Sequence, residues 1–227
     1  MIAIIYEDNH LIIVNKKATE LVQGDITGDV PLLEKVRHYL KQRYNKPGNV
    51  FVGLPHRLDR PTSGVVVFAK TSKALSRMNA IFRSREVQKT YWAVVKNKPK
   101  EDDTVLVNYL KKSGEKNKSF VEKNDKNGAK FADLHYKLIC SSDRFQLLEV
   151  TPNTGRHHQI RLQLSAIGSP IKGDLKYGSD RSNKDGSIHL HARKIEFIHP
   201  IKKEVVSFEA PVPDEQLWNV FRKLLQL

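Results

Sequence analysis

Short runs of β-branched and apolar residues, each followed by polar turn residues, recur along the chain and require a fold built around a sheet. The expected strands cover residues 2–6, 11–15, 64–69, 90–95, 105–110, 133–140 and 145–151, with two more in the tail. Helical spacing of apolar residues marks 31–44, a stretch after the cap candidates Thr71 and Ser72 to about Ser84, 157–167 and a final stretch from about Pro213. Because strands and helices mix without regular alternation, we expect an α+β fold with a central mixed, largely antiparallel sheet flanked by helices and loops.

The chain is long enough to bury one substantial core, and one lysine-rich segment is too polar to belong to it. The 227 residues are 39% hydrophobic and show no internal repeat, so we expect a single domain spanning residues 1–227. The segment 111–130 carries seven lysines together with Gly and Asn. We expect an exposed basic arm or hairpin there, either a solvated loop or an arm that contacts RNA.

A large excess of positive charge indicates the class of partner. The 39 Lys and Arg residues outnumber 25 Asp and Glu residues, which gives a formal net charge of +14. Such an excess concentrates phosphate groups and releases their counterions, so it favours a nucleic acid, although basic residues also serve solubility.

The cysteine content and the hydropathy of the chain indicate its cellular compartment. Cys140 is the single cysteine, which excludes an internal disulfide and a zinc site made of cysteines. The first residues do not show the long apolar run after basic residues that is typical of a signal segment, and no apolar run approaches the roughly 18 residues that span a bilayer. We therefore expect a cytoplasmic protein with soluble partners and no membrane role.

One short segment concentrates groups suited to catalysis immediately before an expected buried strand. Residues 56–64, with the sequence HRLDRPTSG, place the carboxylate of Asp59 among two arginines and two hydroxyl groups. Nearby positive charge favours the ionised form of Asp59, and an ionised carboxylate can act as nucleophile or base. A surface turn with ordinary ion pairs explains the same residues equally well.

A second cluster, residues 154–161 with the sequence TGRHHQIR, lies where a strand is expected to end and a helix to begin. Exposed N–H groups at a helix start, together with Arg156, suit an RNA phosphate or a carboxylate. We expect Arg161 to lie one turn after His157 on the same helical face. A basic helix start without a special function is the alternative.

Two further features bear on metals and on base recognition. His189 and His191 alternate along an expected strand, but no third ligand accompanies them, so we expect packing or hydrogen-bonding roles and no metal. Lys89 and Tyr91 share one side of a strand, where Tyr91 can either stack on a base or pack in the core. Glycine-rich nucleotide-binding loops and the esterase serine motif are absent, so we expect chemistry without a cofactor.

Taken together, these segments resemble the RluA family of pseudouridine synthases over nearly the whole chain. The resemblance rests on residues 6–8 and 11–16, 56–59 and 62–64, Lys89 and Tyr91, 154–156 and 158–161, and positions from Gly168 to Ala192. Lys17 stands where the family usually has Pro, and Gln163 where His is common; we expect neither to touch the chemistry. The chain starts at the first motif, so the small RNA-binding S4 domain of many relatives is expected to be absent, leaving target recognition to the catalytic domain.

The resemblance implies a pseudouridine-synthase catalytic domain that converts specific uridines in structured ribosomal or transfer RNA to pseudouridine. No cofactor and no obligatory protein partner are implied. By similarity Asp59 attacks the uridine or removes a sugar proton, Tyr91 stacks on the base and helps remove the C5 proton, and Arg161 pairs with Asp59. The implied substrate-binding residues are His56, Arg57, Arg60, Thr62, Lys89, Arg156, His158 and Gln159.

Two functions of other classes are compatible with the same composition. A catalytically silent, basic RNA-binding module would use the surface charge alone, although Asp59, Tyr91 and Arg161 together argue against it. A metal-dependent nuclease or deaminase would use the histidines and would carry stoichiometric bound metal.

Overall fold

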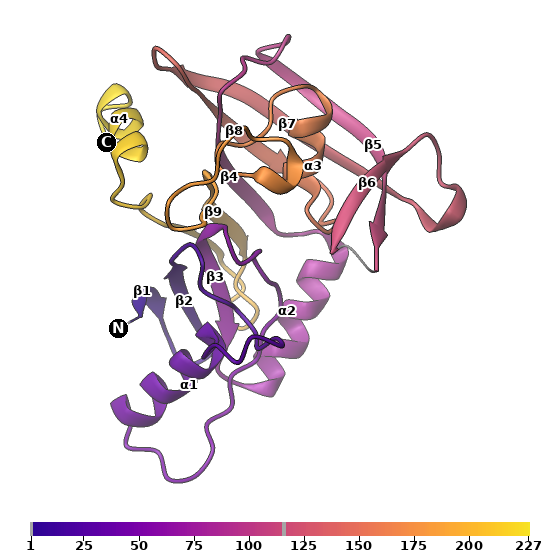
Figure 1. Cartoon of the computed structure of the whole chain (residues 1–227). Coiled ribbons are helices and arrows are strands. Elements are labelled where there is room, and N and C mark those ends of the chain that lie inside the picture. The colour runs from indigo at the N-terminus through magenta and orange to yellow at the C-terminus, as the bar shows by residue number, and fades with distance from the viewer. Residues whose placement is uncertain (1, 115–116) are drawn as a thin grey trace. The chain divides into compact units, whose positions relative to one another are not determined.

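A computed structural model describes residues 2–114 and 117–227, which fall into two compact units. Unit 1 contains the chain up to Lys89 together with residues 192–212, and unit 2 contains residues 90–191 and 213–227. The expected α+β class is confirmed, and the strand pairs with a described register are antiparallel (Figure 1). That the two units form a single domain stays a prediction.

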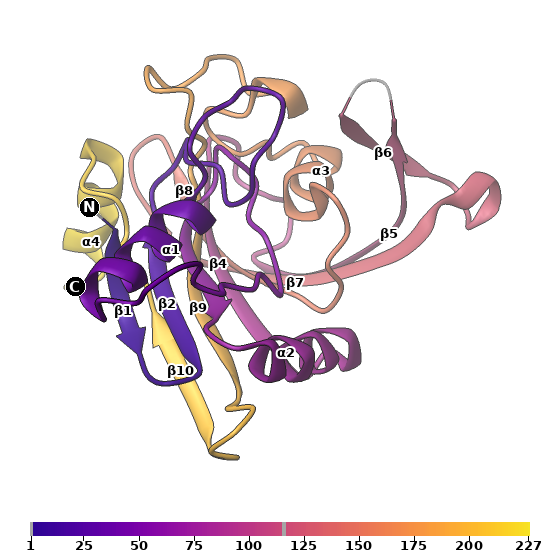
Figure 2. The ribbon, with the colours of Figure 1, turned by 90° about the horizontal axis from the view of Figure 1, so that it is seen from below.

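Unit 1 is a sheet with two long helices beside it. Its strands run in the order β1-β2-β3-β9, and β10 pairs with β9. The strand bounds are β1 Ala3–Glu7, β2 Leu11–Lys16, β3 Ser63–Ala69, β9 Leu190–Ile198, which enters unit 1 at Ala192, and β10 Val205–Glu209. The helices α1 (Leu32–Arg43) and α2 (Ser72–Ser84) flank these strands (Figure 2).

Burial on both faces explains why β2 and β3 are continuous apolar runs. Leu11 and Ile13 of β2 pack in one cluster with Ala74 and Met78 of α2. Ile12, which points to the opposite face, is also fully buried. The start of α2 is capped by Thr71, whose hydroxyl accepts the Ala74 N–H at 3.1 Å.

Gly64 allows two strands of unit 1 to come together directly after the segment that contains Asp59. Its φ of +116° is a conformation that side chains disfavour, and a Cβ there would lie 2.3 Å from the carbonyl oxygen of Ala192. The final glycine of the HRLDRPTSG segment is therefore required by the approach of β3 to β9.

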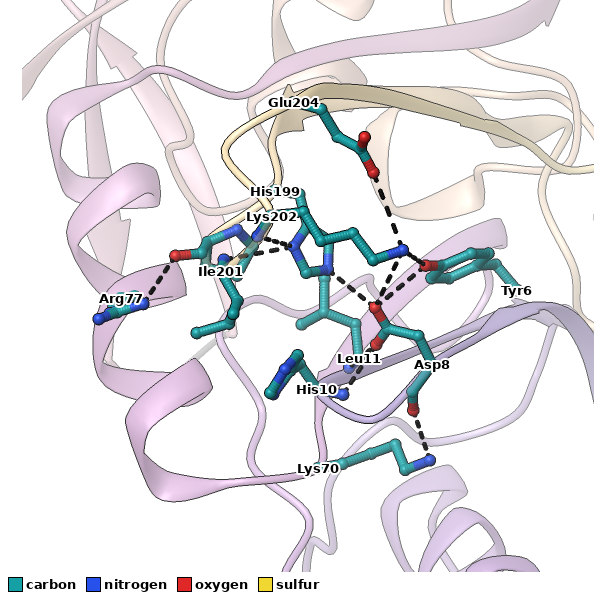
Figure 3. A network of polar contacts seen from close by, with 11 residues as sticks. Tyr6, Asp8, His10, Leu11, Lys70, Arg77, His199, Ile201, Lys202 and Glu204 are labelled. Carbon is teal, nitrogen blue, oxygen red and sulfur yellow. Dashed lines mark hydrogen bonds and ion pairs between the residues drawn. The ribbon is translucent and has the colours of Figure 1, made fainter.

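A buried polar network joins the turn after β1 to the turn before β10 (Figure 3). Asp8 accepts the N–H groups of His10 and Leu11 through Oδ1, and its Oδ2 lies 3.1 Å from Nε2 of His199. Nδ1 of His199 accepts the N–H of Lys202 at 3.0 Å, so Nε2 carries the proton that faces Asp8. Asp8, part of the first motif, thus fastens segments that are distant in the sequence.

Unit 2 carries a second set of strands, in the order β4-β8-β7-β5-β6. The bounds are β4 Gln88–Val95, β5 Asp103–Ser113, β6 Lys118–Glu122, β7 Lys130–Ser141 and β8 Gln146–Pro152; the first two residues of β4 belong to unit 1. The helices are α3 Gln159–Ala166 and α4 Gln216–Leu224, with short 3-10 turns η1 Lys126–Gly128 and η2 Leu175–Tyr177. Ile160 and Leu164 of α3 belong to the same core cluster as Leu134 of β7 and Leu148 of β8.

The lysine-rich segment contributes a hairpin to unit 2. In its described part, β5 and β6 pair with Lys111 opposite Phe120 and Lys112 opposite Ser119. Ser119 is buried, and its N–H donates to the Tyr177 hydroxyl at 2.8 Å, whereas Phe120 is exposed. One side of the hairpin is therefore fastened to the unit and the other faces solvent.

Candidate active site

Asp59 lies in an irregular segment that leads into β3. Its carbonyl oxygen accepts the Thr62 N–H at 3.1 Å, which closes a turn around Arg60 and Pro61. Leu58 and Thr62 are buried on either side of the turn, while the Asp59 side chain is only partly buried. The turn thus fixes the backbone that carries the carboxylate.

Lys16, the last residue of β2, fastens this segment from inside unit 1. The amine is fully buried and donates to the carbonyl oxygens of Lys17, Glu20 and Arg60 at 3.0, 2.8 and 3.1 Å. Burial lowers the pKa of Lys16 to about 7, although the negative charges of Glu20 and Asp59 favour the ammonium form. Lys16 was not among the predicted site residues, although a lysine at the end of a buried strand could have indicated such a role, since lysine is rarely buried without partners.

His56 is a neutral acceptor that supports β3. Its Nε2 accepts the Val67 N–H at 3.0 Å, and its ring stacks on Phe82 with centroids 4.8 Å apart. Burial, and then the charge of Lys89, lower the pKa of His56 to about 3. The contacts of His56 are those of a structural residue, and its role in RNA binding stays a prediction.

The arginines of the segment are more exposed than its hydrophobic residues. Arg57 is exposed and reaches Oε1 of Gln23 at 3.4 Å, and Arg60 pairs with Asp29 while its Nε donates to the Thr19 carbonyl oxygen. Both guanidinium groups are accessible to a phosphate.

The neutral state of His56 predicts a specific acid sensitivity. In the unfolded chain the His56 ring is protonated below about pH 6.5, whereas in the folded protein it stays neutral down to about pH 3. His56 therefore lowers the free energy of unfolding as the pH falls through this window. His56→Gln keeps an acceptor for Val67 and removes the titration. Between pH 6.5 and 5 we expect the variant to lose about 1 kcal/mol less unfolding free energy than the parent, because solvent screens a half-buried ring. Urea titrations at both pH values measure this, and equal losses in the two proteins would contradict it.

In unit 2, the second cluster forms a turn before α3. The helix begins at Gln159, and His158 precedes it with φ 54°, a left-handed conformation. The expectation that His157 and Arg161 share one helical face was therefore wrong, because the chain turns at His158 before the first helical residue. His157 instead lies 2.9 Å from the hydroxyl of Ser119 through Nδ1.

Gln159 and His158 are occupied by contacts within unit 2. Oε1 of Gln159 accepts from the Thr154 hydroxyl and the Arg156 N–H, and Nε2 donates to the Asp133 carbonyl oxygen. His158 lies 2.9 Å from the Tyr177 hydroxyl, and burial, followed by the charge of Arg161, lowers its pKa to about 2. Both residues shape the turn, and their contact with RNA stays a prediction.

Arg161 and Asp174 form a buried, bidentate ion pair. Nε of Arg161 lies 2.6 Å from Oδ2 of Asp174, Nη2 lies 2.9 Å from Oδ1, and the two side chains are 6% and 1% exposed. The guanidinium also lies over the Tyr177 ring, 5.2 Å from its centroid. Asp174 lies within the matching stretch from Gly168 to Ala192 but was not among the predicted site residues. The predicted pairing of Arg161 with Asp59 joins residues of different units and stays a prediction.

Tyr91 lies on β4 opposite Val150 of β8 and is partly buried against the core cluster of unit 2. Trp92, the next residue, is buried, as expected of its opposite direction along the strand. Lys89 is partly buried, and burial lowers its pKa. Tyr91 is thus only partly covered within unit 2, and its stacking on a base stays a prediction.

The histidines proposed as alternative metal ligands have other contacts. Nε2 of His189 lies 3.0 Å from Glu215, and the ring of His191 packs against Trp218. Among the described residues, no group of three or more His, Cys, Asp or Glu side chains is arranged to hold a metal ion. In the same part of the chain, none of the helices has the length and apolar character needed to cross a bilayer.

Residues 10–166 match the sequence model of the RNA pseudouridylate synthase family, a span that includes Asp59, Tyr91 and Arg161. The chain belongs to this family. It is 36% identical to the Ribosomal large subunit pseudouridine synthase C of Vibrio vulnificus (strain CMCP6), over 97% of this chain and 69% of the relative. It is 32% identical to the tRNA pseudouridine synthase C of Pectobacterium carotovorum subsp. carotovorum, over 92% of this chain and 59% of the relative.

The fold agrees with this membership. The solved structure of Human RNA Pseudouridylate Synthase Domain Containing 4 superposes with a TM-score of 0.80 at 24% identity and covers 97% of this chain and 92% of that one. The protein is an RNA pseudouridine synthase, an isomerase, and the resemblance seen in its motifs is confirmed. Membership in this family, and not any property of the histidines, sets aside the nuclease and deaminase alternative.

Proposed function

We propose that this pseudouridine synthase isomerises specific uridines in structured ribosomal or transfer RNA and that Asp59 is the essential residue. The observation that carries the proposal is the turn at residues 59–62, which presents one partly buried carboxylate between buried neighbours in the motif typical of the family. The relatives named above act, by their names, on large-subunit ribosomal RNA and on tRNA.

The reaction exchanges one bond for another within a single nucleotide. The C1′–N1 bond breaks, the base turns, C5 bonds to C1′, the proton leaves C5 and N1 takes up a proton, so the product has the same composition as the uridine. Asp59 supplies the carboxylate that attacks the nucleotide or removes a sugar proton. Tyr91 stacks on the base and assists loss of the C5 proton, and Arg161, oriented by Asp174, supplies positive charge to the reacting centre.

We assign RNA binding to side chains that are exposed to solvent or that lack a hydrogen bond within the described residues. Arg57 and Arg60 are exposed cations beside Asp59, suited to phosphates of a uridine that has left its stack. The buried Thr62 hydroxyl makes no hydrogen bond within the described residues and can serve a bound nucleotide. Lys89 and Arg156 supply further charge. His56, His158 and Gln159 belong to the same two motifs, and their contact with RNA is part of the proposal.

The proposal is tested by mapping pseudouridine in total RNA from cells with and without the gene, complemented with the intact gene or with an Asp59→Ala copy. Loss of one or a few sites, restored by the intact copy alone, supports the activity and names the substrate. RNA binding by the purified protein without any site that depends on the gene would favour the silent RNA-binding module.

A further inference from the structure

Unit 2 contains a basic cavity, and none of the residues assigned to the reaction lines it. It has a volume of about 790 Å³, within the roughly 300–1,000 Å³ of ordinary ligand pockets. Three parts of the unit line it: the residues after β4, the turn between β7 and β8, and the segment between α3 and β9. The lining residues are Lys96, Asn97, Arg144, Phe145, Pro170, Lys172 and Gly178 to Ser182.

The charge of the lining favours an anion. Four cations, on Lys96, Arg144, Lys172 and Arg181, face one carboxylate, Asp180. Lys96 pairs with Asp180 at 2.9 Å, but the two side chains are 64% and 73% exposed, so the pair is weak and a phosphate can replace it. Lys172 donates to the side-chain oxygen of Asn183 and keeps further donors for a ligand.

Two of the cations belong to exposed arginines, Arg144 and Arg181. Among the residues that the structure describes, the guanidinium groups of Arg144 and Arg181 form no hydrogen bond or ion pair, and both side chains are exposed. The N–H groups of structural arginines usually donate hydrogen bonds to acceptors of the protein. Two arginines that keep all their donors at one cavity are suited to the bidentate binding of phosphate oxygens.

The cavity is also lined by apolar and amide groups, which suit a ligand larger than a simple anion. Phe145 and Pro170 line the same cavity and offer a surface for a base or a ribose, and Asn97 carries an amide. Cations interleaved with an aromatic ring are typical of sites that bind single-stranded nucleic acid. A cavity of this size also accommodates more than one phosphate.

We infer that this cavity binds the phosphodiester backbone of the substrate RNA, outside the nucleotide that reacts. The inference rests on the proposed function, because it takes the occupant to be a flanking stretch of the same RNA. Its wall is continuous with the segment that holds Arg161: the Ser179 N–H donates to the Asp174 carbonyl oxygen at 3.0 Å, and the Ser179 hydroxyl accepts the Gly173 N–H at 3.0 Å. RNA bound here therefore contacts the loop that carries Asp174.

The test is the salt dependence of RNA binding by the double variant Arg144→Ala/Arg181→Ala. Neither guanidinium forms a hydrogen bond or ion pair with the residues that the structure describes, so the fold is expected to survive, which circular dichroism verifies. The probe is an unmodified in vitro transcript of large-subunit ribosomal RNA. We expect the dissociation constant to rise about tenfold, and the slope of log Kd against log salt to fall by about 1.4, since each lost phosphate contact on a single strand contributes about 0.7.

A matched control and two contrary outcomes make the test decisive. Lys100→Ala/Lys137→Ala removes the same charge from two exposed residues of unit 2 that do not line the cavity, and the slope should stay at the parent value. A parent-like slope and Kd in the Arg144/Arg181 variant, while the parent protein binds and isomerises the transcript, would overturn the inference and leave the proposed function intact. Saturable binding of uridine 5′-monophosphate that Arg144→Ala/Arg181→Ala abolishes, with RNA affinity unchanged, would instead identify a small-ligand site and also overturn it.

Discussion

Asp59→Asn is expected to reduce pseudouridine formation more than about 1,000-fold while the protein stays folded and binds RNA with nearly the parent affinity. The amide has almost the shape of the carboxylate, so the turn closed by the Thr62 N–H to the Asp59 carbonyl oxygen is retained. What is lost is the negative charge, and with it the ability to act as nucleophile or base. Single-turnover assays on the RNA identified by mapping measure the effect without the complication of product release.

The matched control is Asp143→Asn, an exposed carboxylate of unit 2 for which the described residues provide no hydrogen bond or ion pair. This variant should turn over at the parent rate. If Asp59→Asn instead keeps more than about a tenth of the parent rate, the assignment of Asp59 fails, because loss of a catalytic acid or base typically costs at least about 100-fold.

Much of the fold could be predicted from local pattern, since β2, β3, α1 and α2 are each specified by the spacing of their own apolar residues. The start of α3 could not. TGRHHQIR looks like a helix start throughout, but Tyr177 and Ser119, distant in the sequence, bind His158 and His157 and stabilise a left-handed turn there. Tertiary contacts of this kind leave no local signal.

In the candidate site, too, the contacts between residues distant in the sequence could not be predicted. Asp59 was identifiable because its flanking residues form a dense motif, whereas the support of that segment is visible only in three dimensions. Lys16 reaches the Arg60 carbonyl oxygen from 44 positions away in the sequence. The partner of Arg161 was equally hidden, since Asp174 follows it by 13 residues and lies beyond the end of α3, in a segment without helical or strand periodicity.

The ion pair between Arg161 and Asp174 leads to a second prediction of large effect, on stability. Asp174→Leu leaves the Arg161 guanidinium buried without its counter-charge, and Arg161→Met leaves the Asp174 carboxylate in the same condition. Each single variant is expected to lose about 3 kcal/mol of unfolding free energy, because an unpaired buried charge is far more costly than a paired one. The double variant Arg161→Met/Asp174→Leu removes both charges and should be more stable than either single variant, as urea titrations will show.

Activity separates the structural role of the pair from a chemical one. If Arg161 supplies charge to the reacting centre and Asp174 orients it, the double variant will fold and still lack turnover, because restored packing does not restore the guanidinium. Asp174→Glu, which keeps the counter-charge on a longer side chain, should retain part of the stability and displace Arg161, so that kcat falls more than KM rises. Turnover regained in the double variant would show that Arg161 serves only to neutralise Asp174, and the reaction would then have to draw its positive charge from other groups, of which Arg57 and Arg60 lie nearest to Asp59 in the sequence.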